Sequence, residues 1–378
     1  MKKKKVNIIA ILSYGRSGTG LISSLFDGHR DISIFPDHIT QNLYSFWDFY
    51  KKKDKNYIFK KFVEIYEILF EPKIKKNYFH KSVGIIGSAY QCGFCELGEN
   101  KNIVINADKK KFIKYLKSFF LKKKFNRKNF FIAIHYAYNF SVFNKKKTNY
   151  IFYNLHVPSK KIFNEFLKDF PDAIFIQTLR EPLSGMYSMF RAFNERSFFD
   201  GDYIFSIINM IKERGNYNFL NKKKLIYLKL ENLHKDSART IKLLCKKISV
   251  PFRSNLLKST INGLKWHNEV GKTLRISGFS KKIINQNYED YFWIKDDFIF
   301  YKFFREKYEQ LSYKKKNYDF IFSKLIFYIC LFLPFKIEVI QLKKKQNIKK
   351  LFNLFVCYLK IRFLIFKFIN KPKKFKIN

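Results

Sequence analysis

The chain has 378 residues, enough to bury a substantial hydrophobic core in one large domain or in one domain with an appendage. Its 75 Lys and Arg outnumber its 30 Asp and Glu, which gives a net charge of +45. The lysines form short runs over nearly the whole chain, so we interpret most of them as solvated faces and disfavour specific nucleic-acid binding. The 5 Cys are few and irregularly spaced, so they imply no disulfide framework.

Two features at first suggest a metal site and a secretion signal. Cys92 and Cys95 form a lone C-x-x-C pair, whereas a structural zinc site needs four ligands, so we expect no metal. Residues 2–5 are lysines followed by a short apolar run, but no A-x-A cleavage site follows. We therefore interpret that run as a strand and expect a cytoplasmic protein.

Residues 7–25 contain the most informative stretch. Residues 7–12 predict a buried strand, residues 13–20 are small, polar and rich in glycine, and a helical pattern follows. A strand, a glycine-rich turn and a helix N-terminus direct several backbone N–H groups at one point, which is a site for a phosphate or sulfate group. Arg16 adds a planar, permanent cation. No Lys-Ser or Lys-Thr pair follows the last glycine, so a nucleoside triphosphatase is disfavoured.

Further along the chain, strands and helices alternate. Strands are predicted at residues 32–35, 83–89, 149–154, 173–179 and 224–230. Helices are predicted within residues 41–70, at 108–121 with Asp108 at the N-cap, at 160–170 after Ser159, from Pro182 onward, and at 236–247. This alternation predicts an α/β fold with a parallel sheet and helices on both faces. A ligand should then lie at the carboxyl ends of the strands, where Arg16, His156, Arg180 and Glu231 occur.

A second motif follows the strand at residues 173–179. Arg180 stands at the end of that strand, and Ser188 follows eight residues later in the next helix. An Arg fork and a hydroxyl from the first turns of a helix can converge on one phosphate. This motif predicts a second anion site.

Together the two motifs resemble those of the sulfotransferases that use 3′-phosphoadenosine 5′-phosphosulfate (PAPS). The stretch that resembles their 5′-phosphosulfate loop comprises Arg16, Ser17, Gly18, Thr19, Gly20 and Leu21. Arg180 and Ser188 resemble their 3′-phosphate motif. A strand ending at Glu231, and a late loop around Trp266 with Lys265, Lys272 and Arg275 in or behind it, are weaker matches. The resemblance covers residues 7–280, with a poorly matched interior at about 40–145.

The resemblance implies a P-loop-like fold and sulfuryl transfer from PAPS to a hydroxyl or amine, without a metal. The loop and Arg180, Ser188, Lys265, Lys272 and Arg275 would bind the nucleotide, and Glu231 would be structural first. Arg16 would act electrostatically on the leaving group, since its pKa is too high for it to donate a proton. The acceptor implied is a sugar, glycan or glycolipid.

The acceptor must lose a proton as it attacks, so a base is needed. His156, followed by Val157 and Pro158, is similar to the family's His after a strand and is our first candidate. Asp37 stands near the acidic position of carbohydrate sulfotransferases and is the alternative. His38 and His135 are lesser candidates.

The sequence predicts an α/β domain at residues 1–312, with a variable helical region on the acceptor side at about 40–145, and a basic, apolar tail at 313–378. Residues 325–335 and 351–370 are apolar, the latter interrupted by Lys and Arg. A helical appendage, an interfacial segment that contacts a membrane through residues 319–370, and a membrane span all remain open. For the whole protein, a P-loop kinase and a non-enzymatic basic protein that binds membranes or nucleic acid are the alternatives.

Overall fold

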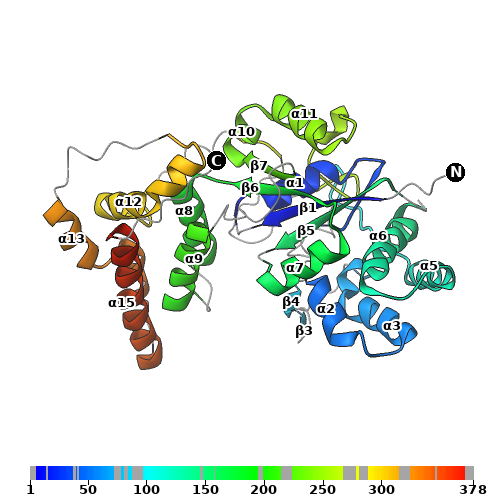
Figure 1. Cartoon of the computed structure of the whole chain (residues 1–378), viewed down its shortest axis with the longest axis horizontal. Coiled ribbons are helices and arrows are strands. Elements are labelled where there is room, and N and C mark those ends of the chain that lie inside the picture. The colour runs from blue at the N-terminus through cyan, green and yellow to red at the C-terminus, as the bar shows by residue number, and fades with distance from the viewer. Residues whose placement is uncertain are drawn as a thin grey trace. The chain divides into compact units, whose positions relative to one another are not determined.

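The computed structural model describes most of the chain in two compact units (Figure 1). One unit comprises residues 1–13, 18–178 and 217–281, and we call it the sheet unit. The other comprises residues 14–17, 179–216 and 282–378, and we call it the helical unit. The described residues are 6–13, 16–36, 40, 42–71, 78–80, 84–86, 97–144, 148–156, 158–194, 199–213, 224–266, 278–280, 288–314, 324–344 and 347–370.

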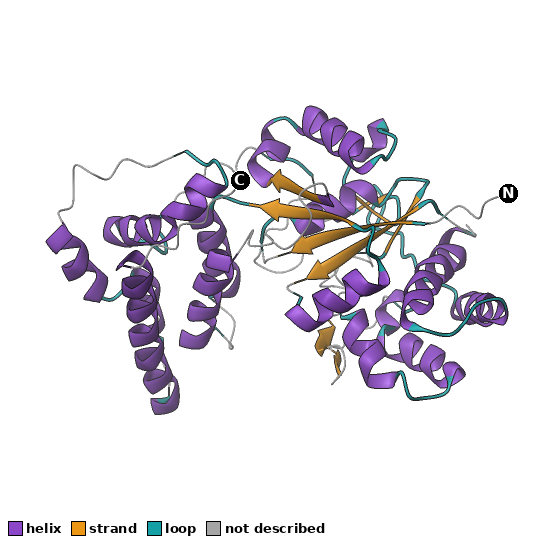
Figure 2. Cartoon of the chain, in the orientation of Figure 1, coloured by secondary structure: helices purple, strands orange, loops and turns teal. Residues whose placement is uncertain are grey.

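A five-stranded sheet in the order β2-β5-β1-β6-β7 forms the centre of the sheet unit (Figure 2). Its strands are β1 (Asn7–Ser13), β2 (Ile32–Ile34), β5 (Tyr150–His156), β6 (Ile174–Leu179) and β7 (Leu225–Lys229). β1 pairs in parallel with both β5 and β6, and β2 pairs in parallel with β5. The apolar run of β1 is buried because neighbours on both sides and helices on both faces cover it. The predicted α/β class, with parallel strands in a central sheet and helices on both faces, is confirmed.

The remaining elements of the sheet unit are helices and two small hairpins. The helices are α1 (Thr19–Phe26), α2 (Leu43–Tyr50), α3 (Lys55–Ile65), η1 (Glu67–Leu69), α5 (Lys109–Leu121), α6 (Arg127–Phe143), α7 (Lys160–Asp169), α10 (Leu230–Lys235), α11 (Ser237–Ile248) and η3 (Ser254–Leu257). The hairpins pair β3 (Tyr78–His80) with β4 (Gly84–Ile86) and β8 (Thr260–Ile261) with β9 (Leu264–Lys265).

Two helix starts predicted from the sequence are confirmed by their caps. The Asp108 carboxylate accepts a hydrogen bond from the Lys111 backbone N–H at 2.9 Å, which begins α5. The Ser159 hydroxyl accepts one from the Ile162 backbone N–H at 3.3 Å, which begins α7. Such caps satisfy backbone donors that a helix cannot pair internally.

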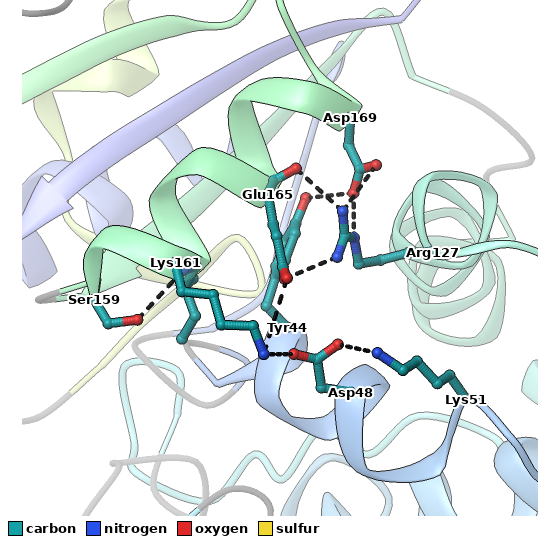
Figure 3. A network of polar contacts seen from close by, with 9 residues as sticks. Tyr44, Asp48, Lys51, Arg127, Ser159, Lys161, Glu165 and Asp169 are labelled. Atoms are coloured by element: carbon teal, nitrogen blue, oxygen red, sulfur yellow. Dashed lines mark hydrogen bonds and ion pairs between the residues drawn. The ribbon is translucent and has the colours of Figure 1, made fainter.

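A polar network holds α2, α6 and α7 together (Figure 3). Arg127 donates to Asp169 at 2.6 Å and to Glu165 at 2.8 Å, and the Tyr44 hydroxyl donates to Asp169 at 3.0 Å. The guanidinium also lies over the Tyr44 ring, 5.0 Å from its centroid. The Glu165 and Asp169 carboxylates thus bind the same Arg127 guanidinium, and this network links α2 and α6 to α7.

The helical unit contains α8 (Pro182–Phe193), α9 (Gly201–Glu213), α12 (Ile294–Gln310), α13 (Lys324–Phe332), α14 (Lys336–Leu342) and α15 (Ile348–Asn370). Pro182 is the first residue of α8, as predicted. Buried side chains of all six helices form one apolar cluster. The domain boundary at 312/313 stays a prediction, and residues on both sides of it contribute to this cluster.

A buried arginine organises the end of the helical unit. Arg362 on α15 is 1% exposed and forms an ion pair with Glu338 on α14, with one N–O distance of 2.7 Å. It also donates to the backbone carbonyls of Leu331 at 3.0 Å and Leu333 at 2.8 Å, which lie at the C-terminus of α13. One side chain therefore joins three helices.

Candidate functional site

The described part of the loop between β1 and α1, residues 16–18, contains two left-handed backbone positions. Arg16 and Gly18 both have positive φ, 53° and 88°, and α1 begins directly after Gly18. Gly18 occupies the N-cap and has no side chain to offer to the first backbone N–H groups. A Cβ on Gly18 would lie 2.4 Å from Leu230 Cδ1, so a larger residue would displace the Leu230 side chain and would also be strained at this φ.

The two sequence motifs contact each other. The Arg16 Nε–H donates to the Ser188 hydroxyl at 3.4 Å. Arg180 Nη1 donates to the Arg16 backbone carbonyl at 3.2 Å. Arg180 is 4% exposed and Arg16 is half-buried. Two guanidinium groups and a hydroxyl therefore lie close together within the helical unit.

Three further residues position Arg180, and sequence reasoning missed all of them. Arg180 Nε donates to the Ser184 hydroxyl at 3.0 Å. The Ser184 backbone N–H donates to Glu181 Oε2 at 2.5 Å, so Glu181 is the N-cap of α8. The Tyr288 hydroxyl donates to the same oxygen at 3.4 Å, and burial raises the pKa of Tyr288. Ser184 lies one helical turn beyond Arg180 and could have been found from that spacing, whereas nothing in the sequence pairs Tyr288 with Glu181.

Hydroxyl groups of the sheet unit support the start of α1. The Thr19 and Thr178 hydroxyls lie 3.3 Å apart. The Ser23 hydroxyl donates to the Asn154 side-chain oxygen on β5 at 3.1 Å. These side chains are buried, and their hydrogen bonds hold the first two turns of α1 against β5 and β6.

The candidate base His156 is the last residue of β5. Its backbone pairs in register with Ser13, the last residue of β1. The chain therefore leaves the sheet at neighbouring points after β1 and after β5. The placement of its side chain is not described, and Asp37 and His38 lie outside the described residues.

The weaker nucleotide-binding candidates are placed only in part. Lys265 is on β9, where its ammonium group forms an exposed ion pair with Glu99 at 2.5 Å. Lys272 and Arg275 lie outside the described residues. Glu231 falls in the first turn of α10, two residues beyond β7.

The hairpin that carries Lys265 packs on α1. Its turn residues Asn262 and Gly263 both have positive φ, the backbone of a tight two-residue hairpin turn. The Gly263 backbone N–H donates to Asp27 at 2.7 Å, immediately after α1. The Trp266 indole donates to the Ser259 hydroxyl at 2.8 Å. The hairpin thus fixes the far end of the helix that begins at the loop.

His135 is a core residue. It is 1% exposed on α6, and its Nδ1 lies 2.7 Å from the Phe131 backbone carbonyl. The rings of Phe35, Phe131 and Tyr153 surround it. A side chain enclosed in this way cannot reach an acceptor, so His135 is removed from the candidate bases.

Within the described residues, no group of three or more His, Cys, Asp or Glu is arranged to hold a metal ion. Cys92 and Cys95 lie outside those residues.

No family model matches the chain, and no curated protein matches it. Similar solved structures are sulfotransferases. A sulfotransferase domain from the curacin biosynthetic pathway has a TM-score of 0.43 and 14% identity, covering 83% of this chain and 100% of that one. A sulfotransferase domain from the Synechococcus PCC 7002 olefin synthase has a TM-score of 0.41 and 13% identity, covering 76% and 86%. Sulfotransferase STF9 from Mycobacterium avium has a TM-score of 0.35 and 11% identity, covering 66% of each chain. Since all three scores are below 0.5, the functional argument rests on the chain's own motifs and contacts.

Proposed function

We propose that this protein is a PAPS-dependent sulfotransferase. One observation carries the proposal: residues of two motifs that stand far apart in the sequence contact each other. Arg16 reaches Ser188 across 172 residues, and Arg180 reaches Arg16 across 164 residues. An isolated glycine-rich turn or a surface ion pair would not require this convergence.

The residues present fit the chemistry of PAPS. The nucleotide carries a phosphate at the 3′ position and a phosphosulfate at the 5′ position, both anionic. Within the helical unit, Arg16 and Arg180 offer planar donors of fixed charge, and Ser188 offers a hydroxyl. When bound, PAPS would supply the sulfuryl group.

Two tasks in the transfer fall to this chain's own residues. Negative charge grows on the leaving phosphate, and we assign its stabilisation to Arg16 together with the loop N–H groups. The attacking hydroxyl or amine loses a proton, and we assign the base to His156, whose backbone ends the strand beside β1. Asp37 is the alternative base. The acceptor that we propose is a sugar, glycan or glycolipid, and the location that we propose is cytoplasmic.

The nucleotide site can be tested by measuring binding of the product, 3′-phosphoadenosine 5′-phosphate. Arg16→Ala and Arg180→Ala should each weaken binding by about tenfold or more, because each removes a charge-assisted contact. Arg30→Ala is the matched control, since this side chain is 69% exposed in a weak ion pair with Asp31. The proposal would be refuted if the parent protein did not bind this nucleotide, or if all variants bound it with equal affinity. Magnesium-dependent turnover of ATP would support a kinase instead.

The base can be tested by comparing His156→Ala with Asp37→Ala, using labelled PAPS and a panel of sugar acceptors. Loss of a well-placed base lowers turnover by roughly 10²–10⁴-fold. We expect this loss for His156→Ala, with the affinity for the product nucleotide unchanged. If Asp37→Ala shows the loss and His156→Ala does not, the assignment moves to Asp37.

A further inference from the structure

The C-terminal helices expose an unusual amount of apolar surface. More than half of the exposed large hydrophobic side chains in the described part of the chain lie between Leu325 and Phe366. On α15 they recur every three or four residues, so they form one stripe along the helix. We call the following residues the α15 stripe: Ile348, Phe352, Phe355, Leu359, Phe363 and Phe366. With 23 residues, α15 is about 35 Å long, and the stripe runs along most of it.

Helix α13 extends this surface. It runs antiparallel to α15, because Tyr328 contacts Phe366 with ring centroids 5.7 Å apart, while the Tyr358 hydroxyl donates to the Phe332 carbonyl. On α13, Leu325, Ile329 and Phe332 are 70%, 56% and 56% exposed. The opposite faces of both helices are buried in the apolar cluster with α9 and α12 (Figure 1). The exposed apolar side chains of α13 and α15 therefore project from helices whose opposite faces are packed in the core.

The charges on these helices are almost all of one sign, although Asp202 of α9 lies beside them, with a carboxylate oxygen 4.0 Å from Lys360 Nζ. Residues 324–370 contain nine Lys, one Arg and a single acidic residue, Glu338. Glu338 is 2% exposed and paired with Arg362, so it offers no negative charge to a partner. Lys349, Lys360 and Lys367 are exposed. At about 100° per residue they fall in a row along one edge of the α15 stripe.

We propose that α13 and α15 bind the surface of an anionic phospholipid bilayer, with the α15 stripe inserted at the boundary between headgroups and acyl chains. An apolar stripe bordered by cations matches that boundary, where acyl chains and anionic headgroups are both within reach. A second copy of this chain would bring the same positive charge to the same face. A nucleic acid would match the lysines but would leave the Phe, Leu and Ile side chains in water. This proposal is independent of the sulfotransferase proposal.

The geometry favours lying on the membrane over crossing it. Among the described residues, one apolar stretch, Leu325–Leu342, is long and apolar enough to span by length and composition. The structure divides it into α13 and α14, of 9 and 7 residues, or about 14 Å and 10 Å, whereas a bilayer core is about 30 Å thick. α15 is long enough to span, but it carries five Lys and Arg between residues 349 and 367.

The test is co-sedimentation of the full chain with vesicles of phosphatidylcholine alone or with phosphatidylserine added. We expect binding that needs the anionic lipid. Phe352→Ser/Phe355→Ser/Phe363→Ser should lower the partition coefficient about a hundredfold or more, because three apolar side chains no longer enter the bilayer. Lys349→Glu/Lys360→Glu/Lys367→Glu should lower it at least tenfold. The matched controls are Phe49→Ser/Leu121→Ser/Leu243→Ser and Lys117→Glu/Lys122→Glu/Lys246→Glu, all exposed in the sheet unit, and neither should change binding tenfold.

A second measurement reports insertion directly. On vesicle binding, the fluorescence emission of the tryptophan introduced by Phe355→Trp should shift to the blue and should be quenched by brominated acyl chains. The emission of the tryptophan introduced by Leu121→Trp should show neither effect. Three results would overturn the proposal: no binding to either vesicle, equal loss from the tail and control variants, or self-association in solution that the Phe→Ser changes abolish without affecting vesicle binding. The last result would assign the stripe to a second copy of the chain.

Discussion

At the scale of single residues, the β1–α1 loop depends on two left-handed backbone positions. Ser17 lies between Arg16 and Gly18, whose φ angles are 53° and 88°. A non-glycine residue such as Arg16 holds this conformation at a cost of about 1 kcal/mol. The fold accepts that cost at the residue whose guanidinium contacts Ser188. Backbone strain located at a proposed binding residue agrees with a preorganised site.

Gly18→Ala should damage this loop. Alanine at φ 88° is strained, and its Cβ would lie 2.4 Å from Leu230 Cδ1. We expect a loss of roughly 1–3 kcal/mol in the free energy of unfolding and weaker nucleotide binding, measured by urea denaturation and calorimetry. Gly28→Ala is the control, because its Cβ would meet only ordinary contacts at 3.4 Å and beyond. Equal effects of the two substitutions would contradict the prediction.

At the scale of elements, α6 shows why a buried helix can be hard to find in a sequence. Ten of its 17 residues are buried. Between Phe130 and Ala137 the only polar groups on the side chains are the His135 imidazole and the Tyr136 hydroxyl, so this part of the helix has no polar face. Sequence patterns identify a helix by one apolar stripe, and α6 has apolar residues all round. Because His135 is buried on this helix, the stability of the protein should also depend on pH.

The pH dependence follows from the sign of the shift. Burial lowers the pKa of His135 from 6.5 to about 4. Between those values the unfolded chain binds a proton and the folded protein does not, so stability is full above pH 6.5 and is lost as the pH falls toward 4. This group alone should lower the free energy of unfolding by about 2 kcal/mol between pH 7.5 and 5.0. In His135→Gln, the free energy of unfolding measured by urea denaturation should fall less between pH 7.5 and 5.0 than in the parent protein. An equal fall in the two proteins would refute the assignment.

At the scale of the whole molecule, the tail depends on one buried ion pair. Arg362→Met would leave Glu338 buried without its guanidinium and would free the carbonyls of Leu331 and Leu333. Breaking a buried pair in this way costs about 3–5 kcal/mol. We expect that loss in chemical denaturation, with a smaller loss in Arg362→Met/Glu338→Gln, because the double variant removes the stranded charge. A double variant less stable than the single one would contradict this account.

The sequence predicted those features that depend on residues close together in the chain. Buried strands, the Asp108 and Ser159 caps and Pro182 at the start of α8 all follow from neighbouring residues, and all are confirmed. The strand order and the contact between Glu181 and Tyr288 join residues far apart in the chain, and no local pattern encodes them. The roles of the proposed site residues stay predictions.

The position of β1 at the middle of the sheet has a consequence for biosynthesis. Asn7 pairs with the backbone near Tyr150, and β6 joins on the other side only after that. At about 5–20 residues per second, the ribosome needs roughly 7–27 s after making β1 before either partner strand exists. During that interval, one of the most apolar strands of the protein has both edges unpaired. Folding of the nascent chain should therefore depend on a chaperone that shields residues near the N-terminus until β5 emerges.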